Sequence, residues 1–285
     1  MVRRPDMNIS YDVFAWDTNH YQDKAPVRKC ARAWKMVHQE RSPKAVLLVH
    51  GFSGYPGELI RPGLDLYEAG FDCFAPRLPG HGTSGDDFLA SKAEDWIGTI
   101  YDAYTNLSKR YSNVYLVGHS MGGAIATIIA DAFDVQRLAL LAPALLIPSI
   151  PVWKLRLFRH FVKRLKVSWK SDPEYHFYYE GDKDDDEFLG AEYWSYTFPT
   201  AVWELEKVRR QAVACLDHLV ADTLIISGGL DKTVPQAASR LVMEKAHGSN
   251  KHLHIPAASH FMPYDKDLPA QDKAMESVVS WLAKG

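Results

Sequence analysis

The chain has 285 residues, which is long enough to bury a large core as one or two domains. Its 47% apolar and 24% charged residues are typical of globular proteins, and a net charge of −2 gives no basis for nucleic-acid binding. Three scattered cysteines favour a reducing compartment over a disulfide framework. The sequence contains neither a signal peptide nor an apolar run of membrane-spanning length, so we expect a cytoplasmic protein. It also lacks the cysteine and histidine spacings of common metal sites, and we expect no metal or cofactor.

Strands and helices alternate along most of the chain. Apolar runs predict strands at residues 45–49, 71–75, 114–117, 135–141, 223–227 and 252–255, with weaker candidates at 9–16 and 31–37. The helical periodicity predicts helices at residues 59–69, 91–110, 123–132, 236–246 and 271–283. This alternation is typical of a mostly parallel sheet with helices on both faces and a functional site beyond the carboxyl ends of the strands.

A glycine-rich turn joins the strand at 114–117 to the helix that follows it. The turn reads G-H-S-M-G from Gly118 to Gly122, a G-x-S-x-G motif with Ser120 at its centre. Between a strand and a helix, this motif holds a nucleophilic serine at the edge of a sheet, and its glycines let the two elements approach closely. The helix N-terminus would then stabilise an oxyanion beside Ser120. The alternative is a chance match in a glycine-rich turn.

A serine hydroxyl needs an adjacent base, and the base needs an acid that orients it. After a strand-turn-helix serine, the acid and then the histidine are expected further along the chain. Asp231 lies in a glycine-rich loop after one predicted strand, and His260 lies in the loop after the next. Both loops start at the same edge of the sheet, so we expect Ser120, Asp231 and His260 to form a catalytic triad. The alternatives are a turn-capping role for Asp231 and a surface-loop position for His260.

Two backbone N–H groups are expected to bind the oxyanion of a tetrahedral intermediate. One belongs to Met121, directly after the serine, and the other to Phe52, in the H-G-F-S-G loop after the first strong strand. Removing one such donor typically costs about 2.7–4 kcal/mol of transition-state stabilisation. The neighbouring His119 is expected to point beside the nucleophile, and His50 and His81 are expected to brace loops.

Five parts of the sequence together carry a family resemblance. They are H-G-F at 50–52, R-L-P-G-H-G at 77–82, G-H-S-M-G-G at 118–123, G-L-D at 229–231 and His260. Through them the chain resembles the α/β-hydrolases of the monoacylglycerol lipase, lysophospholipase and carboxylesterase group, from about residue 45 to the C-terminus. The resemblance implies the α/β-hydrolase fold and the triad. It does not identify the substrate, because the same framework serves esterases, lipases, thioesterases and some peptidases. The N-terminus departs from the family, because its usual hairpin is only weakly indicated.

The alternation of strands and helices stops between residues 144 and 203. Residues 153–170 in this segment are predicted to form one amphipathic helix with an apolar stripe and a basic face. We interpret 144–203 as a helical lid inserted after the sixth strand, into an α/β-hydrolase core of residues 1–143 and 204–285. The alternative is a pair of ordinary helices in the outer layer.

Two features of the predicted lid concern its partners. Its basic helix suggests weak contact with a membrane surface, whereas the sequence favours a solvated face that the acidic run at 180–187 neutralises. Tyr193, Trp194, Phe198 and Trp203 are candidates for the lining of a substrate pocket. The alternative is that these aromatic side chains form the lid's own core.

The leading prediction is a serine carboxylic-ester hydrolase that acts through an acyl-enzyme. Its substrates would be small or lipid-like esters, such as monoacylglycerols or short- to medium-chain acyl esters. A thioesterase or a serine aminopeptidase would use the same triad, and an aminopeptidase would need carboxylates such as Glu174 or Glu192 for the substrate amine. A hydrolase-fold ligand receptor without catalysis is the alternative from another class.

Overall fold

A central sheet organises the part of the chain that the computed structural model describes, which comprises residues 9–11, 14, 20–148, 152–175, 177–178, 181–182 and 184–284. Within that part, the sheet has seven strands in the order β1-β3-β2-β4-β5-β8-β9. β1 is antiparallel to β3, and the other neighbouring pairs are parallel. The strands are Trp34–Met36 (β1), Lys44–Val49 (β2), Asp72–Ala75 (β3), Asn113–His119 (β4), Arg137–Leu141 (β5), Asp222–Gly228 (β8) and Lys251–Ile255 (β9). The predicted mostly parallel sheet is therefore confirmed.

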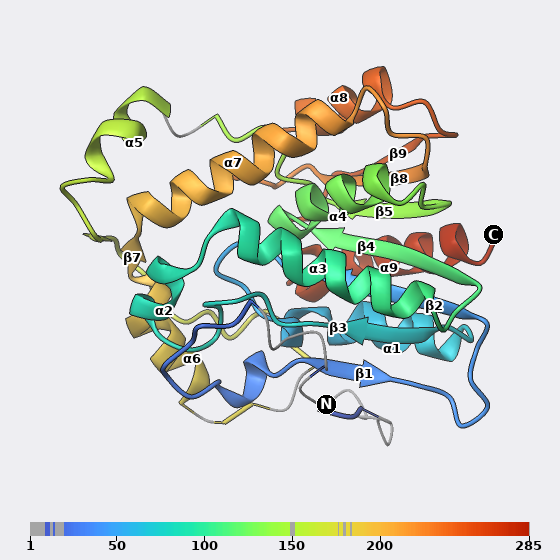
Figure 1. Cartoon of the computed structure of the whole chain (residues 1–285), viewed down its shortest axis with the longest axis horizontal. Helices are drawn as coiled ribbons and strands as arrows, with labels where there is room; N and C mark the ends of the chain where they lie inside the picture. Colours follow the sequence, from blue (N-terminus) through green and yellow to red (C-terminus); the bar gives the residue numbers. More distant parts are fainter. Residues whose placement is uncertain are drawn as a thin grey trace.

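Helices cover both faces of this sheet (Figure 1). They are Ile60–Glu68 (α1) and Leu268–Leu282 (α9) on one face, and Ala93–Ser108 (α3), Met121–Ala132 (α4), Pro199–Cys215 (α7) and Ala237–Lys245 (α8) on the other. Alternate side chains of β2 divide between the two cores: Leu47 and Val49 pack on the α3 and α4 side, and Val46 and Leu48 on the α1 and α9 side. A strand buried on both faces reads as a continuous apolar run, which is why the sequence located these strands.

The N-terminal candidates form less sheet than their patterns indicate. Of residues 31–37, only Trp34–Met36 is a strand. The candidate at 9–16 lies partly outside the described residues, and Ser10 within it forms a single antiparallel bridge with Lys35.

A short helix, α2 (Gly85–Ala90), lies after β3 where the sequence analysis placed no element. The Ser84 side chain caps it by accepting a hydrogen bond from the Asp87 backbone N–H at 3.1 Å. The Asp87 carboxylate in turn accepts from the backbone N–H groups of Lys24 and Ala25 at 2.9 and 3.0 Å. The S-G-D-D sequence at 84–87 is a capping signal that predicts such a helix.

The segment between β5 and α7 differs most from its prediction. Its elements are Val152–Phe158 (α5), Leu165–Lys166 (β6), Asp185–Leu189 (α6), the π-helical turn Gly190–Trp194 and Tyr196–Thr197 (β7). The single helix predicted over residues 153–170 is wrong, because α5 ends at Phe158 and β6 pairs with β7. Leu157 and Phe161 of the expected apolar stripe are 57% and 80% exposed. The stripe therefore lacks the tertiary packing that stabilises most helices. The acidic run at 180–187 lies partly outside the described residues.

The helix α7 packs against α4 and so belongs to the layer that covers the sheet (Figure 1). It begins with Pro199, at a position where proline is favoured, and it contains residue 203. The predicted boundary between lid and core, at residues 203 and 204, therefore falls inside this helix. None of the described helices is both long and apolar enough to cross a membrane.

Candidate active site

Ser120 occupies the sharp turn between β4 and α4. Its φ of 54° and ψ of −118° lie outside the regions that non-glycine residues favour. Backbone hydrogen bonds hold this conformation: the Ser120 N–H donates to the Leu141 oxygen at 2.9 Å, and the Ser120 oxygen accepts from Gly123 and Ala144 at 3.0 and 2.9 Å. The serine is thus placed at the carboxyl end of β4, where the motif predicts it.

The two glycines of the motif are required by close backbone contacts. A Cβ on Gly118 would lie 2.4 Å from the Gly122 oxygen, and a Cβ on Gly122 would lie 2.0 Å from the Val49 oxygen. Backbone atoms cannot move aside as a flexible side chain can, so any larger residue would push α4 away from β2 and β4. The predicted reason for these glycines is confirmed.

The structure brings Ser120, His260 and Asp231 into one hydrogen-bonded chain. His260 Nε2 lies 3.0 Å from Ser120 Oγ, and His260 Nδ1 lies 2.8 Å from Asp231 Oδ2. Asp231 follows β8 and His260 follows β9, so the parallel strands deliver both side chains to the edge that carries the serine. With a proton on Nδ1 that is donated to Asp231, the free Nε2 lone pair accepts the serine hydroxyl.

The Asp231 carboxylate is held in its charged form. Its side chain is only 1% exposed, and this burial raises its pKa. Hydrogen bonds from His260, from the Val234 backbone N–H at 2.8 Å and from the Thr233 backbone N–H at 2.7 Å outweigh burial, so the pKa is lowered overall. The acid can therefore balance a positive charge on His260.

The two predicted backbone donors flank the serine. Met121 is the first residue of α4, where backbone N–H groups have no acceptor within the helix. Phe52 lies in the loop after β2, next to Gly51, and a Cβ on Gly51 would lie 3.3 Å from Ser120 Cβ. Met121 therefore adjoins Ser120 in the chain, and Phe52 lines the same cavity as Ser120.

His119 is a positioning residue whose role the sequence analysis did not assign. Its Nε2 donates to the backbone oxygen of His260 at 2.8 Å. Burial, with a smaller contribution from His260, lowers the pKa of His119 to about 3, so the ring is neutral near pH 7. His119 thus points beside the nucleophile, as expected, and holds the loop that carries His260. His50 also braces a loop as predicted, because its Nε2 accepts from the Leu78 backbone N–H at 3.0 Å.

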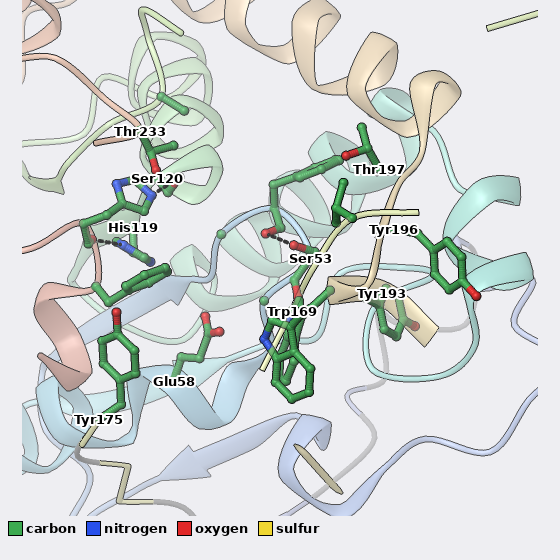
Figure 2. A pocket seen from close by; sticks show the side chains of 18 of the residues that line it. Ser53, Glu58, His119, Ser120, Trp169, Tyr175, Tyr193, Tyr196, Thr197 and Thr233 are labelled. Atoms are coloured by element: carbon green, nitrogen blue, oxygen red, sulfur yellow. Dashed lines mark hydrogen bonds between the residues drawn. The ribbon is translucent and has the colours of Figure 1, made fainter. Parts of the chain in front are cut away.

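A cavity of about 720 Å³ opens over Ser120 and His260 (Figure 2). Of the predicted pocket residues, Tyr193, Trp194 and Phe198 line it. Trp203 does not, because its ring packs against the Arg159 guanidinium at 4.5 Å. Further aromatic residues that line the cavity are Phe52, Phe88, Trp169, Tyr175, Phe177, Tyr196, Phe261 and Tyr264.

The carboxylates suggested for binding a substrate amine are placed elsewhere. Glu192 accepts from the Gly85 backbone N–H at 2.6 Å, and Glu174 pairs with Lys266 at 3.0 Å. Neither residue is among those that line the cavity. The buried carboxyl that does line it belongs to Glu58, which the sequence analysis did not identify.

Asp182, Asp184 and Asp185 form the one group of carboxylates, among the described residues, that is close enough to share a metal ion. Arg28 already donates to Asp184 and Asp185, at 2.7 Å each. The guanidinium supplies the positive charge that a cation would bring, and the cluster does not line the cavity. This arrangement fits an ionic contact between the N-terminal loop and α6.

Comparison with known proteins agrees with this geometry. The family model described as serine aminopeptidase, S33, matches residues 40–267. A thermostable monoacylglycerol lipase of Bacillus sp. (strain H-257) is 27% identical over 235 residues, which cover 81% of this chain and 88% of the relative.

Solved structures share the fold at lower identity. A structure from a study of LipS and LipT, two metagenome-derived lipolytic enzymes, has a TM-score of 0.78 at 23% identity, over 91% of this chain and 100% of its own. A soluble variant of monoglyceride lipase from Saccharomyces cerevisiae, in complex with a substrate analog, has a TM-score of 0.70 at 18% identity. The match covers 93% of this chain and 98% of the other.

Proposed function

The chain belongs to the hydrolase family described as serine aminopeptidase, S33, and within it we propose that the protein hydrolyses small or lipid-like carboxylic esters. The hydrogen-bonded chain Asp231–His260–Ser120, at the edge of a largely aromatic and aliphatic cavity, carries this proposal. Such a lining favours an acyl chain over a peptide. The similarity to a monoacylglycerol lipase supports the same class of substrate.

In the proposed reaction, Ser120 Oγ attacks the ester carbonyl while His260 Nε2 takes its proton. Asp231 keeps the imidazole in the tautomer that accepts this proton and stabilises the resulting imidazolium. The Phe52 and Met121 N–H groups bind the oxyanion. His260 then protonates the leaving alcohol, and a water activated by His260 hydrolyses the acyl-enzyme.

The function is tested with substrates that share an acyl group and differ in the bond that is broken. Nitrophenyl and glycerol esters should be hydrolysed with saturation kinetics, and faster than acyl thioesters or aminoacyl amides. Faster release from aminoacyl amides would make the protein an aminopeptidase. Binding of the esters without turnover would make it a receptor.

We propose that residues 144–198 act as a lid that supplies part of the acyl pocket. Ile147, Trp194 and Phe198 of this segment line the cavity together with Phe52. The Trp194 indole N–H donates to the Ser53 oxygen at 3.2 Å, which joins the segment to the loop after β2. Because β5 and β8 are neighbours in the sheet, the chain between them leaves and returns to adjacent strands.

Replacing Trp194 by alanine should shift the preferred acyl chain toward longer esters. Each buried methylene contributes about 0.8 kcal/mol, or about fourfold in affinity, until the pocket is full. Loss of the indole enlarges the pocket. The chain length beyond which kcat/KM stops rising should therefore increase, while acetyl ester turnover stays nearly constant. The measurement is kcat/KM along a series of nitrophenyl esters from acetyl to dodecanoyl.

The matched control for this change is Trp203→Ala, because Trp203 lies outside the cavity. It should leave the chain-length profile unchanged. Equal losses on acetyl and long-chain esters in Trp194→Ala would instead assign Trp194 to the support of the fold.

We further propose that the lid binds anionic lipid surfaces through a patch formed by Trp153, Leu157, Phe158, Phe161 and Leu165, called the lid patch. These apolar side chains are 50–80% exposed. They lie among lysines and arginines in residues 152–170, a stretch without an acidic residue. Asp184 and Asp185 of the acidic run pair with Arg28 rather than with these cations. Exposed apolar side chains that alternate with positive charges along the chain complement an anionic bilayer.

The double substitution Leu157→Ser and Phe161→Ser should weaken binding to vesicles that contain phosphatidylglycerol. The wild type should co-sediment with these vesicles more than with pure phosphatidylcholine, and less at high salt, because screening weakens the electrostatic contribution. Val220→Ser is the control, because Val220 is also exposed but lies outside the lid. Unchanged co-sedimentation of the double variant would contradict the role of the lid patch.

A further inference from the structure

Glu58 places a buried carboxyl group in the wall of the catalytic cavity. Glu58 lies in a 3₁₀ turn, Pro56–Leu59, shortly after Phe52, and is only 7% exposed. Oε1 accepts a hydrogen bond from the Tyr264 hydroxyl at 3.3 Å. A Cβ on Gly54 would lie 2.4 Å from Oε2, so the carboxyl occupies space that only a glycine leaves open. Figure 2 shows the carboxyl directed toward the cavity, with Tyr175 and Trp169 on either side in this view.

The contacts of Tyr264 place Glu58 on the His260 side of the cavity. Tyr264 lies in the 3₁₀ turn Met262–Tyr264, directly after the loop of His260. Its ring lies 5.4 Å from that of Phe261, which in turn lies 5.5 Å from the His260 ring. In the proposed reaction His260 protonates the leaving alcohol, so the alcohol must lie against this side.

Another part of the wall has a different chemistry. Ala144, Ile147, Phe198, Val202 and Leu205 line the cavity from the end of β5 and from the start of α7. These side chains are all apolar and suit an acyl chain. The cavity thus combines an apolar region with a carboxyl on the His260 side, which matches an ester of an apolar acid with a polar alcohol.

The surroundings of Glu58 keep its carboxyl protonated near neutral pH. Burial raises its pKa to about 8, and hydrogen bonds from Tyr264 and from the Tyr55 backbone counteract this only in part. The titratable groups packed near it are Tyr264 and, from the turn before β1, Cys30, whose pKa is itself raised by burial. Arg61 of the adjoining α1 donates to Asp65 and Asp272 instead. Lys170, Asp172, Asp186 and His119 line the same cavity.

We propose that the Glu58 carboxyl binds a free hydroxyl group of the leaving alcohol, which makes Glu58 a specificity-determining residue for esters of hydroxylated alcohols such as glycerol. The inference rests on the proposed ester hydrolase function. A carboxylic acid offers one O–H donor and one carbonyl acceptor, so it can pair fully with an alcohol. A simple alkyl alcohol would leave the buried carboxyl without that partner, which is unfavourable.

The test compares glyceryl monobutyrate with propyl butyrate, which share their acyl group and the carbon count of the alcohol. The wild type should favour the glycerol ester in kcat/KM. Glu58→Leu should lose about tenfold on the glycerol ester, mainly through KM, with little change on the propyl ester. Glu58→Gln keeps a donor and an acceptor and should retain the preference. Glu174→Gln, which alters a carboxylate outside the cavity, should leave the preference unchanged.

A second readout is independent of activity. The folded pKa of Glu58 lies above its unfolded value, so its contribution to stability is complete below the unfolded pKa and is lost as pH rises toward about 8. The Tm of Glu58→Gln relative to wild type should therefore increase between pH 5 and about 8 and then level off. A Tm difference that is constant with pH would contradict the buried, protonated carboxyl.

The outcomes separate this inference from the proposed function. If the wild type hydrolyses neither ester, the function fails. If it hydrolyses both, but Glu58→Leu retains the preference or lowers both kcat values equally, the function stands and the role of Glu58 is overturned. A Glu58→Gln variant that loses the preference as fully as Glu58→Leu would also overturn the hydrogen-bonding role.

Discussion

Replacing Ser120 by alanine should reduce ester turnover by a factor on the order of 10⁶, because the hydroxyl that forms the acyl-enzyme is removed. The fold should persist. The hydrogen bonds that hold the turn use the backbone of Ser120, and Ala142 adopts a comparable φ of 44° in the same chain. The measurement is single-turnover and steady-state hydrolysis of a nitrophenyl ester, with Tm as the check on folding. A serine-reactive phosphonate should label Ser120 in the wild type and should not label the variant.

Ser53→Ala provides a matched control for this variant. Ser53 also lines the cavity and also has a φ of 54°, but its hydroxyl donates to the Phe52 oxygen at 2.7 Å rather than to a base. Its loss should leave acylation within a few-fold of wild type. Near-normal turnover by Ser120→Ala would refute the assignment of the nucleophile, whatever the control shows.

Asp231→Asn should lower kcat by a factor on the order of 10⁴ with a small effect on KM. The asparagine amide would donate toward His260 Nδ1 and so favour the tautomer with its proton on Nε2. That nitrogen could then no longer accept the serine proton. The amide oxygen can still accept from Thr233 and Val234, so the loop should remain folded. Steady-state kinetics on a short nitrophenyl ester measure the effect.

Asp222→Asn is the control, because Asp222 begins β8, the strand that precedes the Asp231 loop. Its side chain accepts from the Ser249 backbone N–H at 2.8 Å, at the end of the strand far from the site. It should keep normal kcat. A near-normal kcat in Asp231→Asn would mean that another carboxylate orients His260.

The acid side of the pH profile should not be set by protonation of Asp231. The pKa of Asp231 is lowered, so its carboxylate stays ionised as pH falls through the range where aspartates ordinarily gain a proton. Because the pKa of Asp231 is lower in the folded than in the unfolded protein, its contribution to stability is present above the unfolded pKa. This contribution is lost only as pH falls through the folded pKa. Turnover and Tm, measured as pH is lowered, should therefore show no loss that follows the titration of an ordinary aspartate.

Features that depend on neighbours in the sequence were predictable. The buried runs of β2 and β4 are apolar because both faces of the sheet are covered, and Gly118 and Gly122 are required within one turn. Asp231 and His260 could be proposed because parallel strands carry the loops that follow them to a common edge. The sequence pattern gave a wrong prediction where tertiary packing determines the secondary structure. The residues after Phe158 have the apolar spacing of an amphipathic helix, but their apolar side chains are exposed to solvent. Without packing against the core, the helix ends at Phe158.

The amino-acid sequence by itself determined the alternation of strands and helices, the serine turn and the order of its expected partners, because each of these follows from backbone preferences and burial along a continuous stretch. Only the tertiary structure decided which side chains share the cavity. Tyr264 donates to Glu58 across 206 positions, and His119 donates to the His260 backbone across 141. Trp194 and Trp203 lie nine residues apart with similar chemistry, yet only Trp194 lines the cavity. Such contacts depend on how distant segments pack, and a single sequence carries no local signal for the distance between them.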